Sequence, residues 1–423
     1  MVSISAATRK AATIAVIVAA LGYFVDIYDL ILFGMVRKTS LLDIGVCTGL
    51  DKDACTNALT DQGFHLINYQ MGGMLLGGIL WGMLGDKRGR LSVMFGSITL
   101  YSIANIANGM VHTVDGYTAW RFIAGLGLAG ELGAGITLVS ELMGAERRGF
   151  GTTLVAALGV SGGIVAGLIG GAFPGLDHPT WRQAYFIGGG LGLALLVLRI
   201  GVVESGMFHA AARRADVERG NFFALFRSFA RFKRYLAIIC VGLPVWYVIG
   251  LAFSFSDRIG GALGLDPAPN PATTLFFCYG SCTIGGFACG LLSQYLRSRK
   301  QALGIFLGLT TVALTLYFTI GGMSLTVFYA LAAFGGAASG YWAVFVATAA
   351  ELFGTNLRAT VTTTVPNFVR GAVPLLTLSF QALVPSLHVL GAAIAVGAGT
   401  LVLAAIGLVS LDETFGVDLD FTE

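Results

Sequence analysis

A series of long apolar stretches restricts the fold of this chain more than any other feature of its sequence. A helix that crosses ~30 Å of hydrocarbon needs about 20 mostly apolar residues. The first stretch is too long for the core of a signal peptide and contains acidic residues, so we expect it to be retained. About twelve stretches are long enough, near 12–36, 63–84, 91–111, 117–140, 152–173, 183–203, 236–256, 272–295, 302–321, 326–350, 361–384 and 388–410. They predict an all-α membrane protein with twelve transmembrane helices.

The low content of charged residues excludes a water-soluble protein of this length. Charged residues make up 12% of the chain and hydrophobic residues 56%, whereas soluble domains carry about 25% charged residues. Glycine is abundant, with 60 residues, which is typical of membrane helices whose backbones approach closely. The composition therefore agrees with the prediction from the apolar stretches.

The distribution of lysine and arginine predicts the orientation of the chain. With the N-terminus inside, 19 of the 26 basic residues fall on the inside, counting Arg199 at the end of the sixth stretch. The outside loops keep only Arg37, Lys38, Lys52, Arg182 and Arg258. Because cytoplasmic loops carry the excess of basic residues, we expect both termini to be cytoplasmic.

The longest polar interval, 204–234, divides the apolar stretches six and six. We therefore expect an N-terminal six-helix bundle over 1–203, a basic cytoplasmic linker over 204–234, and a C-terminal six-helix bundle with a short acidic tail over 235–423. The two halves also repeat each other, since Glu141 and Arg148 recur as Glu351 and Arg358 at an offset of 210. Internal repeats of this kind are typical of secondary transporters, and they predict two pseudo-symmetric bundles.

Several short motifs carry a resemblance to a known family. They are Gly85-Asp86-Lys87-Arg88-Gly89-Arg90 between the second and third stretches, Arg121-Phe122-Ile123-Ala124-Gly125 in the fourth, and Asp26-Ile27-Tyr28-Asp29-Leu30 in the first. With these motifs the chain resembles the major facilitator superfamily over nearly its whole length. The first-stretch motif is similar to that of bacterial metabolite:proton symporters, although Gly206 stands where that group usually has proline.

The resemblance implies an architecture and a location. It implies the major facilitator fold, a monomer in the bacterial inner membrane, and a small-molecule solute moved by alternating access. The lipid bilayer and protons are the other expected partners. The paired Glu and Arg motifs resemble the inner-gate motifs of sugar porters and organic-ion transporters.

The loop 85–90 has two possible interpretations. Gly85 and Gly89 permit a tight turn, and an acid such as Asp86 is favoured beside a helix N-terminus. In the first interpretation the loop and its partners form an inner latch that holds the outward-open state. In the second they only set the orientation of the chain in the membrane and cap helices. The residues of the expected inner gate are Gly85, Asp86, Arg88, Gly89, Arg90, Glu141, Arg148, Arg299, Glu351 and Arg358.

Charged residues inside the apolar stretches are the strongest functional signal. A charge at the bilayer centre costs roughly 2.5–3.5 kcal/mol on insertion scales, so it needs a partner, a cavity or a function. Burial favours the protonated form of a carboxyl, and a nearby arginine favours the ionised form. We therefore expect Asp29 with Arg121 to couple transport to protons, with Asp26 as the second candidate and Glu131 as the third. The alternative is a static ion pair between the first and fourth helices.

Arg370 is the expected anchor for the solute. It lies about 18 Å into the eleventh helix, 12 residues beyond Arg358, and a guanidinium binds carboxylates bidentately. A static pair with Asp26 or Glu131 is the alternative. The other candidate solute-binding residues, each of which is also explained by packing, are Asn367, Gln70, Tyr28, Trp246, Tyr247, Tyr341 and Trp342.

The remaining reactive residues add little. Cys47 and Cys55 fall in the first outside loop, where a disulfide or two free thiols are both open. A role as small buried packing residues explains Cys278, Cys282 and Cys289 better than soft-metal binding does. We interpret His65 as a polar lining residue. We find no nucleotide-binding loop, zinc-ligand spacing or nucleophile elbow. We therefore expect no metal, no cofactor, no nucleic acid partner and no enzymatic activity.

These observations predict a secondary active transporter for a small polar or anionic solute, with proton-coupled uptake of a carboxylate, amino acid or similar metabolite as the leading function. The alternatives are a proton-coupled exporter of drugs or metallophores and a membrane sensor that does not transport. The helix-five sequence Gly159-Val160-Ser161-Gly162-Gly163 lacks the proline of the usual antiporter signature, which argues against the exporter.

Overall fold

A computed structural model describes residues 6–88, 90–142, 145–173, 175–203, 222–354 and 357–417, and within them it contains helices and no strands. The elements of the first half are α1 (Ala6–Asp43), α2 (Lys52–Arg88), α3 (Arg90–Asn108), α4 (Val114–Leu128), α5 (Glu131–Leu142), α6 (Ala145–Val160), α7 (Gly162–Ile169) and α8 (Trp181–Val203). Those of the second half are η1 (Phe222–Phe226), α9 (Phe229–Tyr247), η2 (Val248–Phe253), α10 (Ser256–Ala262), α11 (Pro271–Leu296), α12 (Arg299–Ile320), η3 (Gly321–Met323), α13 (Leu325–Ala338), η4 (Ser339–Tyr341), α14 (Trp342–Glu351), α15 (Arg358–Gly371) and α16 (Val373–Ser410).

Local breaks explain why there are more elements than predicted apolar stretches. Pro244 lies inside α9 and lacks the backbone N–H that a helix uses, and the π-helical turn η2 follows it. His388 has a φ of 57° inside α16, which kinks this long element between the last two predicted stretches. Joined across such breaks, the elements follow the twelve predicted stretches in order, so the all-helical fold class is confirmed.

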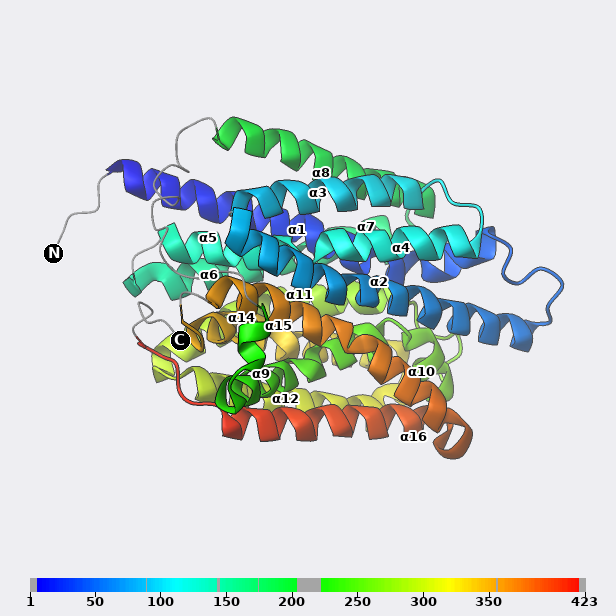
Figure 1. Cartoon of the computed structure of the whole chain (residues 1–423). Coiled ribbons are helices and arrows are strands. Elements are labelled where there is room, and N and C mark those ends of the chain that lie inside the picture. The colour runs from blue at the N-terminus through cyan, green and yellow to red at the C-terminus, as the bar shows by residue number, and fades with distance from the viewer. Residues whose placement is uncertain are drawn as a thin grey trace.

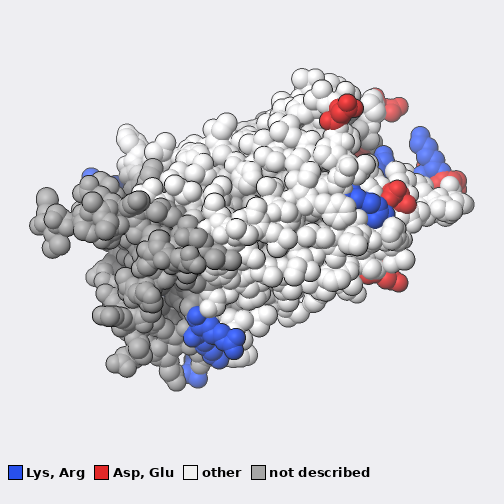
Figure 2. Space-filling view, turned by 90° about the horizontal axis from the view of Figure 1, so that it is seen from above, with Lys and Arg blue, Asp and Glu red and all other residues white. Residues whose placement is uncertain are grey.

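The helices run side by side along one long axis, and α1 begins at the end of the bundle where α16 ends (Figure 1). Seven of the described helices are long and apolar enough to cross a membrane, by length and composition. On the face in Figure 2, the wide middle carries no acidic or basic side chain, and the coloured charges lie toward the two ends. This distribution suits a hydrocarbon layer around the middle of the bundle.

The two halves of the chain pack closely on each other. Helix α2 packs on α15, and α6 and α7 pack on α11. Glycine permits this approach: a Cβ on Gly133 of α5 would lie 2.5 Å from Cα of Thr363 in α15, and one on Gly78 of α2 would lie 2.8 Å from Cβ of Asn367. Small residues at helix crossings are what close packing of membrane helices requires. The predicted linker boundary remains a prediction, because 204–221 lies outside the described residues.

Candidate functional site

Arg370 lies at the centre of a cluster built from both halves of the chain. Its guanidinium carbon lies 5.5 Å from the ring centre of Trp246 and 5.6 Å from that of Trp342, and only 1% of the residue is exposed. Its Nη2 donates to the hydroxyl of Tyr23 in α1 at 3.3 Å, and Trp342 Nε1 donates to the same oxygen at 2.9 Å. The sequence predicted Arg370, Trp246 and Trp342 together, and it missed Tyr23.

Asn367 holds Arg370 in place. It lies one turn earlier in α15 and accepts from Arg370 Nη1 at 3.4 Å. Its amide nitrogen donates to the carbonyl of Ala129, at the junction of α4 and α5, and to that of Thr363, both at 2.7 Å. Asn367 therefore fixes the arginine side chain and ties α15 to the first half of the chain.

The positive charge of Arg370 has no direct counter-ion in the part of the chain that the structure describes. Its contacts there are two neutral oxygens and two aromatic faces, and no described carboxylate forms an ion pair with it. A buried cation without an ionic partner is costly. A guanidinium beside an edge-to-face pair of tryptophan rings offers planar donors and a π surface at one place, which suits an anion attached to a flat ring.

Two buried carboxylates lie on the neighbouring part of α1. Asp26 and Asp29 are both 0% exposed, and neither has a hydrogen-bond partner among the described residues. Asp26 lies within electrostatic range of Arg370, and Asp29 is faced by Arg121 and Asn105 without hydrogen-bonding geometry to either. The structure thus places both acids inside the bundle, as the sequence predicted.

Arg121 binds Gln70 rather than Asp29 in this conformation. Its Nη2 donates to Gln70 Oε1, its Nη1 donates to the hydroxyl of Tyr185 at 3.4 Å, and its guanidinium lies 5.0 Å from the ring centre of Phe33. Gln70 in turn donates to the carbonyl of Leu30 at 3.2 Å. The expected pair of Arg121 and Asp29 is therefore not formed here, although the two residues are neighbours.

Glu131, the third candidate acid, forms a buried ion pair with Arg199 of α8. Arg199 donates to both carboxylate oxygens, one of them at 3.0 Å, and both side chains are almost fully buried. A side chain at Gly22 of α1 would overlap both partners, so this glycine leaves the room for the pair. The sequence did not predict the pair, because Arg199 was counted with the basic residues on the inside.

Three of the predicted aromatic residues use their hydroxyls within their own half of the chain. Tyr28 donates to the carbonyl of Ala184 at 2.8 Å, Tyr247 to that of Ala393 at 2.6 Å, and Tyr341 to that of Val241 at 2.9 Å. Their polar groups are satisfied by the backbone. The structure therefore does not bring these three hydroxyls to Arg370.

The second half of the expected inner gate is assembled at the end of the bundle where α16 ends. Arg299 donates to both oxygens of Glu351 at 3.0 and 3.2 Å, and Arg358 donates to the carbonyl of Ala350 at 3.1 Å. In the first half, Gly85 is buried and Arg88 is exposed. The expected contacts of Asp86, Gly89, Arg90, Glu141 and Arg148 lie outside the described residues and side chains.

A C-terminal glutamate caps helix α12 beside this gate. Glu413 accepts from the Ser298 hydroxyl and from the backbone N–H groups of Arg299 and Lys300. Burial alone would raise the pKa of Glu413, but these hydrogen bonds, with one from the backbone of Phe415, lower it below its ordinary value. The carboxylate is therefore held ionised at the helix N-terminus, where the macrodipole favours a negative charge.

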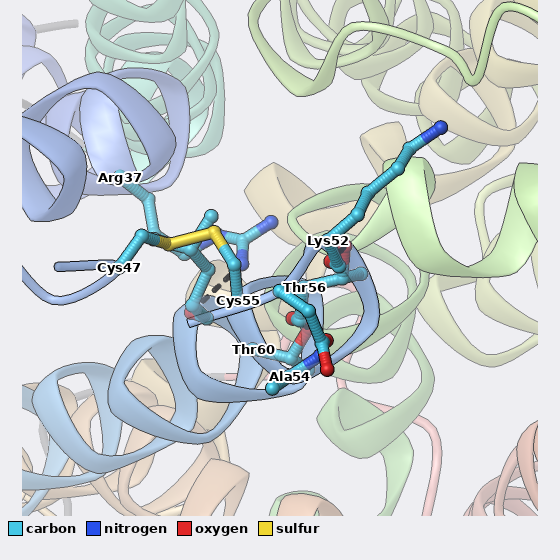
Figure 3. The surroundings of a disulfide bond; sticks show 9 residues. Arg37, Cys47, Lys52, Ala54, Cys55, Thr56 and Thr60 are labelled. Carbon is cyan, nitrogen blue, oxygen red and sulfur yellow. Dashed lines mark hydrogen bonds between the residues drawn. A yellow bond between two sulfur atoms is a disulfide. The ribbon is translucent and has the colours of Figure 1, made fainter. Parts of the chain in front are cut away.

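The opposite end of the bundle, which we call the disulfide end, is closed by contacts between the halves. The structure joins Cys47, in the loop between α1 and α2, to Cys55 in the first turn of α2, with Arg37 beside the bond (Figure 3). Arg37 donates to both oxygens of Asp257 in α10 at 2.7 and 2.8 Å, and its guanidinium lies 4.5 Å from the ring centre of Phe255. Because α1 and α10 belong to different halves, this ion pair must break for the disulfide end to open.

We expect Asp257→Asn to loosen the disulfide end. The change leaves a nearly buried Arg37 without its counter-charge, and losing one member of a buried pair costs about 3–5 kcal/mol. Hydrogen–deuterium exchange should increase around 30–41 and 250–259. The matched control is Asp61→Asn, an exposed acid of α2 at the same end. Equal protection in the two variants would show that the ion pair does not hold this end closed.

Cys278, Cys282 and Cys289 are buried, free thiols of α11. His65, expected to be a polar lining residue, is exposed on α2, and its ring lies 4.6 Å from that of Tyr69. Among the described residues, no group of three or more potential metal ligands gathers in one place.

Comparison with known proteins settles the family. The model of the Major Facilitator Superfamily matches residues 12–377. The chain belongs to this superfamily. The whole-chain fold is also similar to a solved structure of the proton:xylose symporter XylE, with a TM-score of 0.71, 14% identity and 98% of each chain covered.

Curated relatives of this superfamily member are named transporters. It is 27% identical to the 3-(3-hydroxy-phenyl)propionate transporter of Escherichia coli over 76% of this chain and 81% of that protein. It is 37% identical to the niacin transporter NiaP of Acinetobacter baylyi over 28% of this chain and 26% of that protein. The matches to the first curated relatives span less than half of those proteins. The chain is therefore a multi-pass membrane protein of this superfamily, and its named relatives are transporters.

Proposed function

We propose that this transporter takes up a small aromatic carboxylate together with protons. Arg370 beside an edge-to-face pair of tryptophan rings is the observation that carries the proposal, since it combines a charge for a carboxylate with flat surfaces for a ring. The named solutes of the two relatives, niacin and 3-(3-hydroxyphenyl)propionate, are both aromatic carboxylic acids. The relatives thus support the same class of solute that the side chains favour.

Asp29 is the proposed proton carrier of this cycle. An ionised carboxylate buried without a partner is strongly disfavoured, so we infer that Asp29 carries a proton in the conformation described here. Arg121 faces it but is held by Gln70. When the helices rearrange and Arg121 turns to Asp29, the ionised form is favoured and the proton leaves. Asp26 is the second candidate.

Glu131 has a different proposed role. Its ion pair with Arg199 joins α5 to α8 within one half of the chain, so a movement of one half against the other leaves the pair intact. We therefore assign Glu131 to a static ion pair with Arg199, and not to proton transfer.

The remaining parts of the proposal concern the setting of the protein. A monomer in the bacterial inner membrane, with both termini in the cytoplasm, agrees with the distribution of basic residues. In that orientation the disulfide end faces an oxidising compartment, in which a disulfide persists. Alternating access then requires the ion pair at the disulfide end and the inner gate to open in turn.

The proposed function is tested by gradient-driven uptake in proteoliposomes. When the outside is acidic, labelled niacin or benzoate should accumulate against its concentration gradient faster than in protein-free liposomes, which report the passage of the neutral acid through lipid, and a protonophore should abolish the accumulation. The corresponding amides, which keep the ring and lose the charge, should neither accumulate nor compete. Equal transport of acid and amide would contradict the assigned solute class, and accumulation insensitive to protonophore would contradict proton coupling.

A pair of glycines in α8 tests the site around Asp29. A side chain at Gly188 would overlap Asp29 Oδ1 and lie 2.8 Å from Tyr28 Cε1, whereas Gly190 is exposed with no described atom within 4 Å of an added Cβ. We expect Gly188→Ala to lose about 1–3 kcal/mol through overpacking and to impair proton-driven uptake. Gly190→Ala should retain both stability and uptake. Thermal unfolding and uptake of the two purified variants check this. Equal stability and equal uptake in the two variants would show that Asp29 does not lie against Gly188.

A further inference from the structure

Tyr23 is a buried polar residue that the proposed mechanism does not yet use. It lies in α1, one turn before Asp26, and is 1% exposed. Its ring occupies space left by Gly159 of α6, where an added Cβ would overlap the ring carbons. The hydroxyl thus reaches from the first half of the chain to Trp342 and Arg370 in the second half.

The hydroxyl oxygen of Tyr23 takes the place of an anion. Trp342 Nε1 and Arg370 Nη2 both carry hydrogens and no free lone pair, so both donate to this oxygen, at 2.9 and 3.3 Å. Two donors, one of them charged, that meet at a single oxygen are the arrangement that a carboxylate oxygen would fill. In the described conformation this oxygen belongs to the protein itself.

A symporter must also return to its starting side without solute. In that step Arg370 would be buried with its donors unpaired, and unsatisfied buried charges are costly. We propose that the Tyr23 hydroxyl replaces a solute carboxylate oxygen at Arg370 and Trp342 when the carrier closes empty, and so permits the empty carrier to return. This inference rests on the proposed function, because it takes Arg370 as the solute's anchor.

The Tyr23 hydroxyl and the solute carboxylate can replace each other reversibly, because they differ in strength as hydrogen-bond acceptors. A neutral hydroxyl is a weaker partner for a guanidinium than a carboxylate is, so the solute displaces Tyr23 when it binds. When the solute leaves, the hydroxyl satisfies the same donors again. Tyr23 is therefore a positioning residue that acts through Arg370, and it joins the two halves only when the site is empty.

The variant Tyr23→Phe distinguishes closing of the empty carrier from closing of the carrier with bound solute. It keeps the ring and removes only the hydroxyl, so net uptake, which needs the empty return, should fall about tenfold, as expected for one buried hydrogen bond to a charged group. Solute exchange, in which the carrier closes loaded in both directions, should stay within about twofold of the unmodified protein. Labelled niacin in proteoliposomes gives both rates.

A control variant removes a buried hydroxyl that stays inside one half. Tyr317 of α12 donates to the carbonyl of Ala252 in η2 at 3.3 Å, so Tyr317→Phe should leave the ratio of net uptake to exchange unchanged. If Tyr23→Phe lowers both rates equally, or changes neither, the inference is wrong. A purely structural role of Tyr23 predicts the first of these results.

A second measurement needs no solute. Hydrogen–deuterium exchange of the empty, purified carrier should be faster around residues 19–27 and 340–346 in Tyr23→Phe than in Tyr317→Phe, because the empty closed form has lost its link. Unchanged protection would overturn the inference even if niacin proved not to be transported. Failure of the unmodified protein to move any aromatic carboxylate would instead count against the proposed function.

Discussion

Replacing Asp29 by Asn is expected to abolish accumulation driven by a proton gradient while leaving counterflow partly active. The change removes the titratable group but keeps its size and polarity, so no acid remains to link solute to proton. With one proton per solute, a gradient of one pH unit sustains about tenfold accumulation, since a factor of ten corresponds to ~1.4 kcal/mol. In Asp29→Asn, accumulation within the time of the assay should fall to that of protein-free liposomes. Counterflow needs only binding and conformational exchange, and it should survive.

Two further variants make this result specific. Asp26→Asn should be milder, because Asp26 is the second candidate for the carrier. Arg121→Ala should damage both accumulation and counterflow, since it removes the guanidinium that contacts Gln70 and Tyr185 and faces Asp29. Full accumulation in Asp29→Asn combined with its loss in Asp26→Asn would move the carrier to Asp26. Normal accumulation in both variants would contradict proton symport.

Replacing Arg370 is expected to have the largest effect on the solute itself. Removing one member of a buried charged contact costs about 2–5 kcal/mol, so Arg370→Ala should weaken carboxylate binding at least about 30-fold. Arg370→Lys keeps the charge but loses the planar, bidentate donor set and the stacking on Trp246 and Trp342. It should therefore recover only a small part of the affinity.

Competition between acids and amides gives the decisive readout for Arg370. The unmodified carrier should be inhibited by benzoate far more strongly than by benzamide, and Arg370→Ala should lose this preference. A general loss of folding would lower both interactions together and would appear in thermal unfolding. An unchanged preference in a folded Arg370→Ala protein would show that another residue recognises the charge.

Much of the fold was predictable because its signals are local. The length of each apolar stretch and the charges within it do not depend on distant partners, so the helices and the burial of Asp26, Asp29 and Arg370 followed from the sequence. The breaks within helices were less visible. The π-helical turn η2 after Pro244 and the kink at His388 depend on packing as well as on sequence.

The contacts between distant residues could not be predicted. Arg37 pairs with Asp257, 220 positions away, and Glu131 pairs with Arg199. Tyr23 gave no signal at all, because one tyrosine in an apolar helix is ordinary until its hydroxyl is seen beside Trp342 and Arg370. Such pairings arise from how helices distant in the sequence pack together, and no periodicity or spacing encodes that packing.

Direct detection of proton movement tests the central claim most closely. Lightly buffered proteoliposomes, without any initial pH gradient, would receive niacin on the outside while a pH indicator follows the medium. We predict that the medium becomes alkaline as niacin enters, faster than in protein-free liposomes, which report the passage of the neutral acid through lipid. In Asp29→Asn liposomes the change should fall to the protein-free rate. Carrier-mediated entry of niacin with no alkalinisation above that rate would contradict proton-coupled carboxylate transport by this protein.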